Sequence, residues 1–232
     1  GGEGGGGRGE GGGGEGGSAG GAWTRLVAGR EKVGREKGAA CVDHEYWAKP
    51  GRGFGDVNGT LSSFGRAPGA HGSNRTGRMF TGDGSGDFLY PALHRAGLAS
   101  QPRATGRDDA MKLTGLYITA AVRCAPPNNK PQPDELRRCA DWTAREFALL
   151  PKARVILALG KIAHDALLKH YGLKKSIHPF AQAAEFLLPD GKILIDSSHV
   201  SRQNTQTGKL TAKRFEAIIA KALRRAHQPN HH

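Results

Sequence analysis

A glycine-rich loop at residues 65–83 limits what this chain can fold into more than any other stretch. Five glycines and one proline punctuate it, in the order Gly-Arg-Ala-Pro-Gly-Ala-His-Gly-Ser-Asn-Arg-Thr-Gly-Arg-Met-Phe-Thr-Gly-Asp. Glycine has no Cβ, so the backbone of such a loop approaches a ligand closely. The loop follows an apolar, β-leaning stretch at 60–64 and precedes a helical pattern at 85–96, where open α/β sheets hold their sites. It contains neither GxxxxGK(S/T) nor GxGxxG, which excludes the two common nucleotide-binding loops.

Strand-like and helical segments alternate along the rest of the chain. Short apolar runs predict further strands at residues 115–122, 153–159 and 192–196. Helical periodicity predicts helices at 134–149, 161–171 and 211–226, the last with Thr211 as its N-cap. Such an alternation indicates an α/β fold in which both faces of a mostly parallel sheet are covered.

Composition divides the chain into one domain with a tail at each end. Residues 1–21 are almost entirely glycine with scattered Glu and Arg. We expect them to be a disordered tail, because such a segment buries too little apolar area to fold. Residues 22–226 are predicted to form the domain, which begins with a charged helix within 22–48. Residues 227–232 are predicted to be a second disordered tail.

Charge and cysteine content bound the function. The formal net charge is +13 and the pI is about 10.0. This balance favours a nucleic acid partner, although a basic solvated surface gives the same numbers. Three cysteines, an odd number, argue against a disulfide framework and indicate a reducing compartment. No apolar run approaches the roughly 18 residues of a membrane span, and we expect neither a signal peptide nor a membrane partner.

Polar clusters follow three of the predicted strands. Asp83 ends the glycine loop, Asn129 lies in the cluster at 123–131, and His199 lies in the cluster at 197–208. Because the carboxyl ends of parallel strands meet at one rim, we expect these three side chains to converge on one pocket. Taken singly, each has a second interpretation as a turn or cap residue.

Three long motifs occur in a fixed order. The glycine loop is followed by Ala-Ala-Val-Arg-Cys-Ala-Pro-Pro-Asn-Asn-Lys-Pro at 120–131 and by His-Val-Ser-Arg-Gln-Asn-Thr-Gln-Thr-Gly at 199–208. Over about residues 23–226 the chain resembles the family 5 (type b) uracil-DNA glycosylases. The resemblance implies a three-layer α/β/α sandwich with a central four-stranded, mostly parallel sheet. It also implies a base excision repair enzyme that flips uracil out of DNA and hydrolyses its N-glycosidic bond.

The resemblance implies a role for each matched position. Asp83 would activate or orient the attacking water, Asn129 would hold the base or the water, and His199 would face the uracil carbonyl. Phe54 matches the aromatic residue on which the flipped base stacks, and Ala67 matches the small residue that replaces a polar one in other glycosylase families. Six further residues are implied to line the pocket and the DNA groove: His71, Asn74, Arg75, Arg202, Gln203 and Asn204. The last three suit filling the space that the base vacates, or else form a polar loop before a helix.

The resemblance also implies a 4Fe-4S cluster, which needs four cysteine thiolates. Cys124 and Cys139 match the later pair of the family's ligands, but the earlier CxxC aligns with Gly20 and Trp23, which bind no iron. We therefore expect Cys124 and Cys139 to be free thiols. A cluster with fewer irons, a zinc ion and a ligand role for Cys41 are the alternatives.

Further departures affect the first strand and the loops. Ser62 and Ser63 lie where a buried parallel strand favours branched apolar residues, so we expect the first strand to be disrupted. Arg66 replaces an apolar residue of the family inside the glycine loop, and Gly51-Arg52 replaces a Val-Pro pair.

Three functions remain open from the sequence. The first is an active, monomeric glycosylase of the cytoplasm, acting on nucleoid DNA that contains uracil or other deaminated bases. The second is a DNA-binding relative with weak or no catalysis, because two cluster cysteines are missing and the first strand is disrupted. The third is an enzyme that acts on a nucleotide or phosphate metabolite, and only the glycine loop supports this function.

Overall fold

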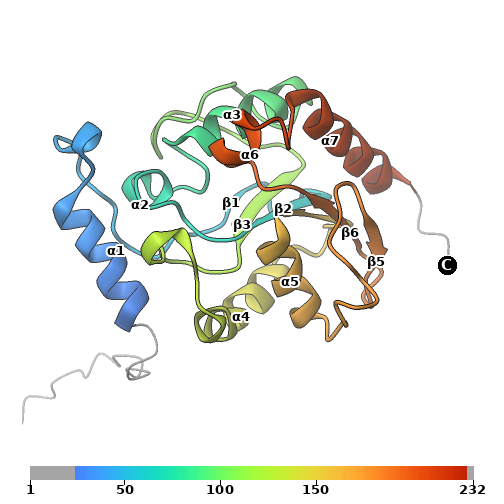
Figure 1. Cartoon of the computed structure of the whole chain (residues 1–232). Coiled ribbons are helices and arrows are strands. Elements are labelled where there is room, and N and C mark those ends of the chain that lie inside the picture. The colour runs from blue at the N-terminus through green and yellow to red at the C-terminus, as the bar shows by residue number, and fades with distance from the viewer. Residues whose placement is uncertain (1–23, 229–232) are drawn as a thin grey trace, which may run out of the picture.

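The predicted alternation of strands and helices is present in the computed structural model, which describes residues 24–228 (Figure 1). The helices are α1 (Thr24–Glu36), α2 (Ser73–Thr76), α3 (Gly84–Arg95), α4 (Pro133–Ala148), α5 (Lys161–His170), α6 (Arg202–Gln206) and α7 (Ala212–His227). The strands are β1 (Phe54–Gly55), β2 (Leu61–Gly65), β3 (Leu116–Ala120), β4 (Val155–Leu159), β5 (Glu185–Leu187) and β6 (Ile193–Ser197). Two 3₁₀ turns lie at Ala39–Cys41 and Pro127–Asn129.

All the strands belong to one six-stranded sheet with the order β1-β3-β2-β4-β6-β5. The four central strands are parallel, and β1 and β5 add antiparallel edges. The predicted α/β fold class is confirmed, whereas the predicted count of four strands was too low. The two edge strands contain only two and three residues, too short for a periodic sequence pattern to reveal.

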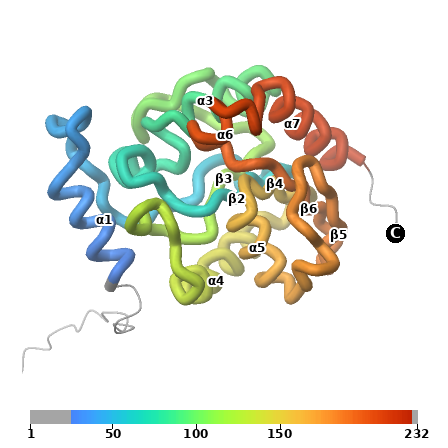
Figure 2. The backbone as a smooth tube through the Cα atoms, in the orientation of Figure 1, coloured from blue at the N-terminus to red at the C-terminus, as the bar shows by residue number. Residues whose placement is uncertain are grey.

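Helices cover both faces of the sheet, as the tube view shows (Figure 2). On one face α3 and α7 bury Leu89 and Phe215 against strand residues such as Val155. On the other face α4 and α5 lie against the sheet, and Phe147 packs near Ile156. Each central strand is therefore buried on both sides, which is why β4 reads as a continuous apolar run.

The expectation that the first strand is disrupted was wrong. β2 forms a continuous ladder with β3 on one side and β4 on the other. Ser62 and Ser63 are fully buried within it, and neither hydroxyl has a hydrogen-bond partner. A buried unpaired hydroxyl costs about 1–3 kcal/mol on mutational scales, yet two full ladders and the neighbouring Leu61 and Phe64 hold the strand in place. One of the two observations that favoured an inactive relative, the disrupted first strand, is thereby removed.

The first and last described helices lie within the predicted domain or end close to its last residue. α1 supplies the charged helix expected within 22–48, and α7 ends at His227, one residue beyond the predicted domain end. Thr211 caps α7 as predicted, because its side chain accepts a hydrogen bond from the Arg214 N–H at 3.2 Å. The predicted glycine-rich tail and residues 229–232 lie outside the described residues. Within the described part of the chain, no helix has the length and apolar character needed to cross a membrane.

Candidate active site

Three parallel strands end at one rim of the sheet, and three loops leave from there. β2 leads into the glycine loop, β4 is followed by Gly160, and β6 leads to His199. The Gly160 N–H donates to Ser197 O at 2.7 Å, which joins the ends of β4 and β6. Gly160 has a φ of +98°, and a Cβ there would lie 3.0 Å from the His199 Cβ, so glycine lets the His199 loop lie against the end of β4.

Asp83 is held at the amino end of α3. Its Oδ1 accepts hydrogen bonds from the N–H groups of Ser85 (3.0 Å) and Gly86 (3.1 Å), which makes Asp83 the N-cap of the helix. Its Oδ2 lies against Gly69 and Gly72, where a Cβ would come within 2.8 Å and 2.0 Å of that oxygen. Burial raises the pKa of Asp83 above its ordinary value, although the two N–H bonds oppose the rise. One carboxylate oxygen is thus used by the helix and the other faces the glycine loop.

His199 is neutral at physiological pH. Burial, with a smaller contribution from the positive charge of Arg66, lowers its pKa to about 4. The Asn204 side chain donates to His199 O at 2.8 Å and fixes the backbone at this position. A neutral imidazole in this environment can donate a hydrogen bond to an oxygen that becomes negative during a reaction.

Phe80 is a site residue that the sequence analysis missed. Its ring centroid lies 6.3 Å from that of His199, and a Cβ on Gly65 would come within 2.9 Å of the Phe80 Cζ. The backbone at Phe80 has a φ of +53°, and its N–H donates to Ser73 Oγ at 3.0 Å. The only signal in the sequence is that Phe80 is the sole Phe, Tyr or Trp of the glycine loop. Its ring direction follows from the unusual backbone, which no sequence pattern predicts.

Asn129 lies on the neighbouring 3₁₀ turn and contacts the glycine loop. Its Oδ1 accepts a hydrogen bond from Ala70 N at 3.3 Å, next to Gly69, which borders the Asp83 carboxylate. The residue is exposed. Among the described residues, no hydrogen bond joins its side chain to Asp83 or His199.

Helix α6 brings Arg202 to the carboxylate. A Cβ on Gly84 would come within 2.2 Å of the Arg202 Nε, so the arginine lies directly over the first turn of α3. The charge of Arg202 lowers the pKa of Asp83 and offsets part of the effect of burial. Gln203 follows on α6 with an exposed side chain. Arg202 therefore lies beside Asp83 and brings the loop after β6 to the amino end of α3.

Three of the residues predicted to line the pocket hold the glycine loop itself. Arg75 donates to His71 O and to Gly82 O, both at 2.9 Å. His71 Nδ1 lies 2.9 Å from the Tyr46 hydroxyl, and the buried Asn74 donates to Arg30 O of α1 at 3.1 Å. These contacts hold the glycine loop together and attach it to Tyr46 and to α1.

Two other predicted residues lie away from His199. Ala67 packs against the apolar cluster that contains Val122 and Cys124. Phe54 is on the edge strand β1, and the guanidinium of Arg78 lies over its ring at 4.8 Å from the centroid.

The cysteines form a packed apolar cluster with α1. Cys124 and Cys139 are 2% and 0% exposed and share this cluster with Leu26 and Val122. Arg30 donates to Cys124 Sγ at 2.9 Å, and burial raises the pKa of Cys139 to about 11. A metal ligand has to be a thiolate, whereas burial favours the protonated thiol.

These residues do not fit a four-thiolate cluster. Cys41 belongs to a separate 3₁₀ turn and is not part of the apolar cluster. Over residues 24–228, no group of three or more His, Cys, Asp or Glu side chains is arranged to hold a metal ion. Gly20 and Trp23, which align with the family's CxxC, lie outside the described residues.

A buried polar pair supports the strand that carries His199. His164 of α5 places Nδ1 2.8 Å from Asp196 Oδ1 and donates from Nε2 to His178 O at 2.9 Å. Nearby, Ser198 N donates to Gln182 Oε1 at 2.7 Å. Both contacts anchor the end of β6 directly before His199, and nothing in the sequence pattern had indicated them.

Comparison with known proteins agrees with this geometry. The profile of the uracil DNA glycosylase superfamily matches residues 52–223. A type-5 uracil-DNA glycosylase of Thermus thermophilus is 58% identical over 203 residues, covering 87% of this chain and 91% of that protein. Type-5 uracil-DNA glycosylases of Mycobacterium bovis and Pyrobaculum aerophilum are 42% and 39% identical, covering 88% and 78% of this chain and 77% and 76% of those proteins. The profile spans more than half of the chain and the Thermus relative nearly all of it, so the chain belongs to the uracil-DNA glycosylase superfamily, in its type-5 branch.

Proposed function

We propose that this protein excises uracil, and with it other deaminated bases, from DNA by hydrolysing the N-glycosidic bond. The observation that carries the proposal is that Arg202, three positions after His199, lies over the first turn of α3, the helix that Asp83 caps, so the loops that carry the two residues meet at one rim of the sheet. The 58% identity to a type-5 uracil-DNA glycosylase supports the same activity.

The two groups suit the charges of the reaction. As the bond between the sugar and the base breaks, the base takes the electron pair and the sugar becomes positive. A neutral His199 donates a hydrogen bond to the uracil carbonyl oxygen and stabilises the developing anion. Asp83, through its free Oδ2, orients a water toward C1′ and stabilises the positive sugar. The water adds to C1′ and releases a proton, and the departing base takes up a proton from solvent.

The base must leave the duplex before it reaches these groups. Unpaired or mismatched uracil flips more readily than paired thymine, which favours damaged DNA. We assign the stacking surface to Phe80, whose ring lies beside His199, in preference to Phe54 under Arg78. Asn129 then holds the base or water from the Ala70 side. The exposed Arg202 and Gln203 of α6 face the duplex, whereas Asn204 holds the His199 backbone.

We propose that the activity needs no iron–sulfur cluster. The buried thiols of Cys124 and Cys139, the Arg30 contact and the Leu26 side chain support this, because together they form a packed apolar contact. We further propose that the protein acts as a monomer on nucleoid DNA in the cytoplasm. Its net charge of +13 supports the DNA partner.

The test is direct excision. Purified protein is incubated with a duplex that carries one uracil opposite guanine, and alkali then cleaves the strand wherever a base is missing. Nicking at the uracil, with none in the matched cytosine duplex, is the expected result. Absence of nicking at every protein excess contradicts the proposal, and tight binding without turnover would favour the DNA-binding relative instead.

A further inference from the structure

A small cavity beside the glycine loop has the chemistry of a nucleotide-binding site. It encloses about 230 Å³. Two aromatic side chains, three arginines and two glycines line it: Trp47, Phe54, Arg52, Arg78, Arg107, Gly53 and Gly77. It contains no carboxylate among these lining residues, and none of them belongs to the Asp83 and His199 group.

Trp47 is fixed against the back of the glycine loop. Its backbone N–H donates to Arg75 O at 2.9 Å, and the backbone N–H of the next residue, Ala48, donates to Asn74 O at 3.0 Å. Gly77 has a φ of +76°, and a Cβ there would come within 2.9 Å of both Trp47 Cγ and Arg107 Cδ. The indole ring therefore rests on the loop at a position that only glycine leaves open.

Arginines lie over both aromatic rings of the cavity. The Arg107 guanidinium is 4.0 Å from the Trp47 ring centroid, and the Arg78 guanidinium is 4.8 Å from that of Phe54. Arg52 joins them through a β-bridge between Arg52 and Arg78. Stacked cations and aromatic faces recur wherever proteins bind single nucleotides of a strand.

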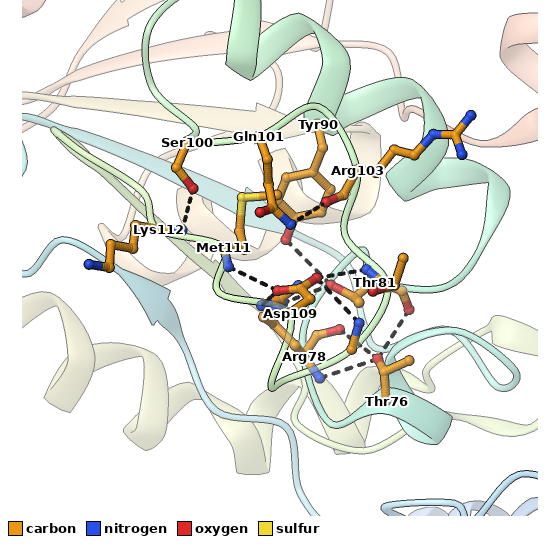
Figure 3. A network of polar contacts seen from close by, with 12 residues as sticks. Thr76, Arg78, Thr81, Tyr90, Ser100, Gln101, Arg103, Asp109, Met111 and Lys112 are labelled. Atoms are coloured by element: carbon orange, nitrogen blue, oxygen red, sulfur yellow. Dashed lines mark hydrogen bonds and ion pairs between the residues drawn. The ribbon is translucent and has the colours of Figure 1, made fainter.

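A buried ion pair holds this arrangement (Figure 3). Arg78 donates to both oxygens of Asp109, at 2.9 Å and 2.5 Å, and the two side chains are 4% and 8% exposed. Asp109 also accepts from the N–H groups of Thr105 and Met111, at 2.7 Å and 3.0 Å, which shapes the loop that carries Arg107. Burial raises the pKa of Asp109, but these bonds outweigh it and hold the pKa well below its usual range. The carboxylate thus neutralises Arg78 and stays charged throughout the working pH range.

The remaining charge of the cavity is positive. Arg52 and Arg107 are exposed, and neither forms an ion pair with a carboxylate of the described residues. Their planar guanidinium groups match the geometry of a phosphate. The volume is below the roughly 300–1,000 Å³ of typical small-molecule sites, so it admits one group of a longer polymer better than a whole free ligand.

We propose that this cavity binds a nucleotide of the DNA strand that flanks the flipped base, with Arg52 and Arg107 on its phosphate and Trp47 beside its base. The assignment rests on the proposed function, because it takes DNA as the substrate. Arg78 lies in the same loop as Asp83, five positions before it, so the cavity is built on the loop that also carries the proposed catalytic carboxylate. The site adds affinity for DNA and takes no part in the chemical step.

The experiment measures binding and catalysis separately. Binding to a duplex with a stable abasic-site analogue requires no turnover, and it is followed as a function of salt for the parent, R107A, R107K and R52A/R107A. Lys152→Ala is the matched control, because Lys152 is exposed and precedes β4, at the amino ends of the parallel strands, whereas Asp83 and His199 follow their carboxyl ends. Excision of uracil at saturating protein gives the rate of the chemical step.

R107A is expected to weaken duplex binding about fivefold or more and to reduce the slope of log K against log salt by about 1. R52A/R107A is expected to lower both the affinity and the salt slope further, and R107K is expected to retain part of the affinity. All three variants are expected to keep the parent's excision rate at saturating protein. Equal affinities and slopes for R52A/R107A and K152A would overturn the proposal. Saturable binding of free dTMP that R107A abolishes would overturn it too, since the cavity would then be a mononucleotide site. If the arginine variants bind DNA more weakly than the parent, but the parent excises no uracil, the proposed function is refuted and the DNA subsite is retained.

Discussion

Asp83 combines two tasks in one carboxylate. Its Oδ1 caps α3 and its Oδ2 faces the glycine loop, so a substitution can remove the charge and keep the cap. Asn caps helices about as well as Asp. This makes the effect of charge on catalysis separable from the effect on folding.

Asp83→Asn is expected to lower the single-turnover excision rate by about 10²–10⁴-fold, the usual contribution of a general acid or base. Its melting temperature and its affinity for an abasic duplex should stay close to those of the parent. Asp87→Asn, an exposed change in the same helical turn, is the control. A rate unaffected by Asp83→Asn would remove Asp83 from the mechanism.

His199 makes stability depend on pH. Its pKa of about 4 in the folded protein lies below the 6.5 of an unburied histidine. Between these values the unfolded chain binds a proton that the folded protein does not, so acidification from pH 6.5 toward 4 favours unfolding.

His199→Asn is therefore expected to lose less stability than the parent on going from pH 7 to pH 5, with a difference of about 1–2 kcal/mol. Urea unfolding at the two pH values measures it. The exposed His94→Asn serves as the control and is expected to follow the parent. An equal pH response in His199→Asn would mean that the pKa of His199 is not lowered in the folded protein.

Elements show where sequence reasoning succeeded. α7 and its Thr211 cap were predictable because a long amphipathic helix repeats its apolar pattern and its cap is local. β1 and β5 were not, because their pairing depends on strands far away in the sequence. β2 was judged broken from Ser62 and Ser63, whereas its stability comes from two neighbouring ladders that the local sequence does not reveal.

The buried serines of β2 give a testable consequence. Ser62→Ala and Ser63→Ala are each expected to raise the free energy of unfolding by about 0.5–1.5 kcal/mol, because each removes a buried hydroxyl without a partner. Ser73→Ala is the contrasting control, since its equally buried Oγ accepts from Phe80 N at 3.0 Å, and it should lower stability. Denaturant unfolding of the three variants decides the matter. Destabilisation in all three would mean that the β2 hydroxyls have partners, such as ordered waters.

α1 is attached through few but buried contacts. Leu26 is fully buried in the cluster that contains Cys124 and Cys139, and Arg25 donates to both oxygens of Glu135 on α4, at 2.6 Å and 2.7 Å. Leu26→Ala is expected to cost about 2–5 kcal/mol of unfolding free energy, as for other buried leucines. Lys32→Ala on the exposed side of α1 should change it by less than about 0.5 kcal/mol. Equal, small effects in urea unfolding would mean that α1 is not docked in solution.

For the whole molecule, the rim of the sheet to which the Asp83 and His199 loops belong was predictable, and the side-chain contacts around these two residues were not. Asp83 and His199 were placed on one rim because parallel strands end together, a rule that needs only the order of elements. Phe80, Gln182 and the His164–Asp196 pair were missed, since each depends on side-chain directions set by loops with no periodic pattern. The cavity at Trp47 likewise unites residues from three separate loops.

The packing of Cys124, Cys139 and Leu26 determines whether the whole molecule needs a metal to fold. If packing around Leu26 replaces the metal, the molecule must fold and act without iron. Freshly purified protein is expected to show no absorption band near about 400 nm, the region of iron–sulfur absorption, and chelator should change neither its melting temperature nor its excision rate.

Cys124→Ala/Cys139→Ala is expected to lose some stability, because two buried side chains shrink, and to retain excision. Cys41→Ala, at the separate 3₁₀ turn, is the control. Protein that contains about four irons per chain, and that loses iron and activity together, would contradict a metal-free fold, because the missing ligands would then have to come from residues outside the apolar cluster.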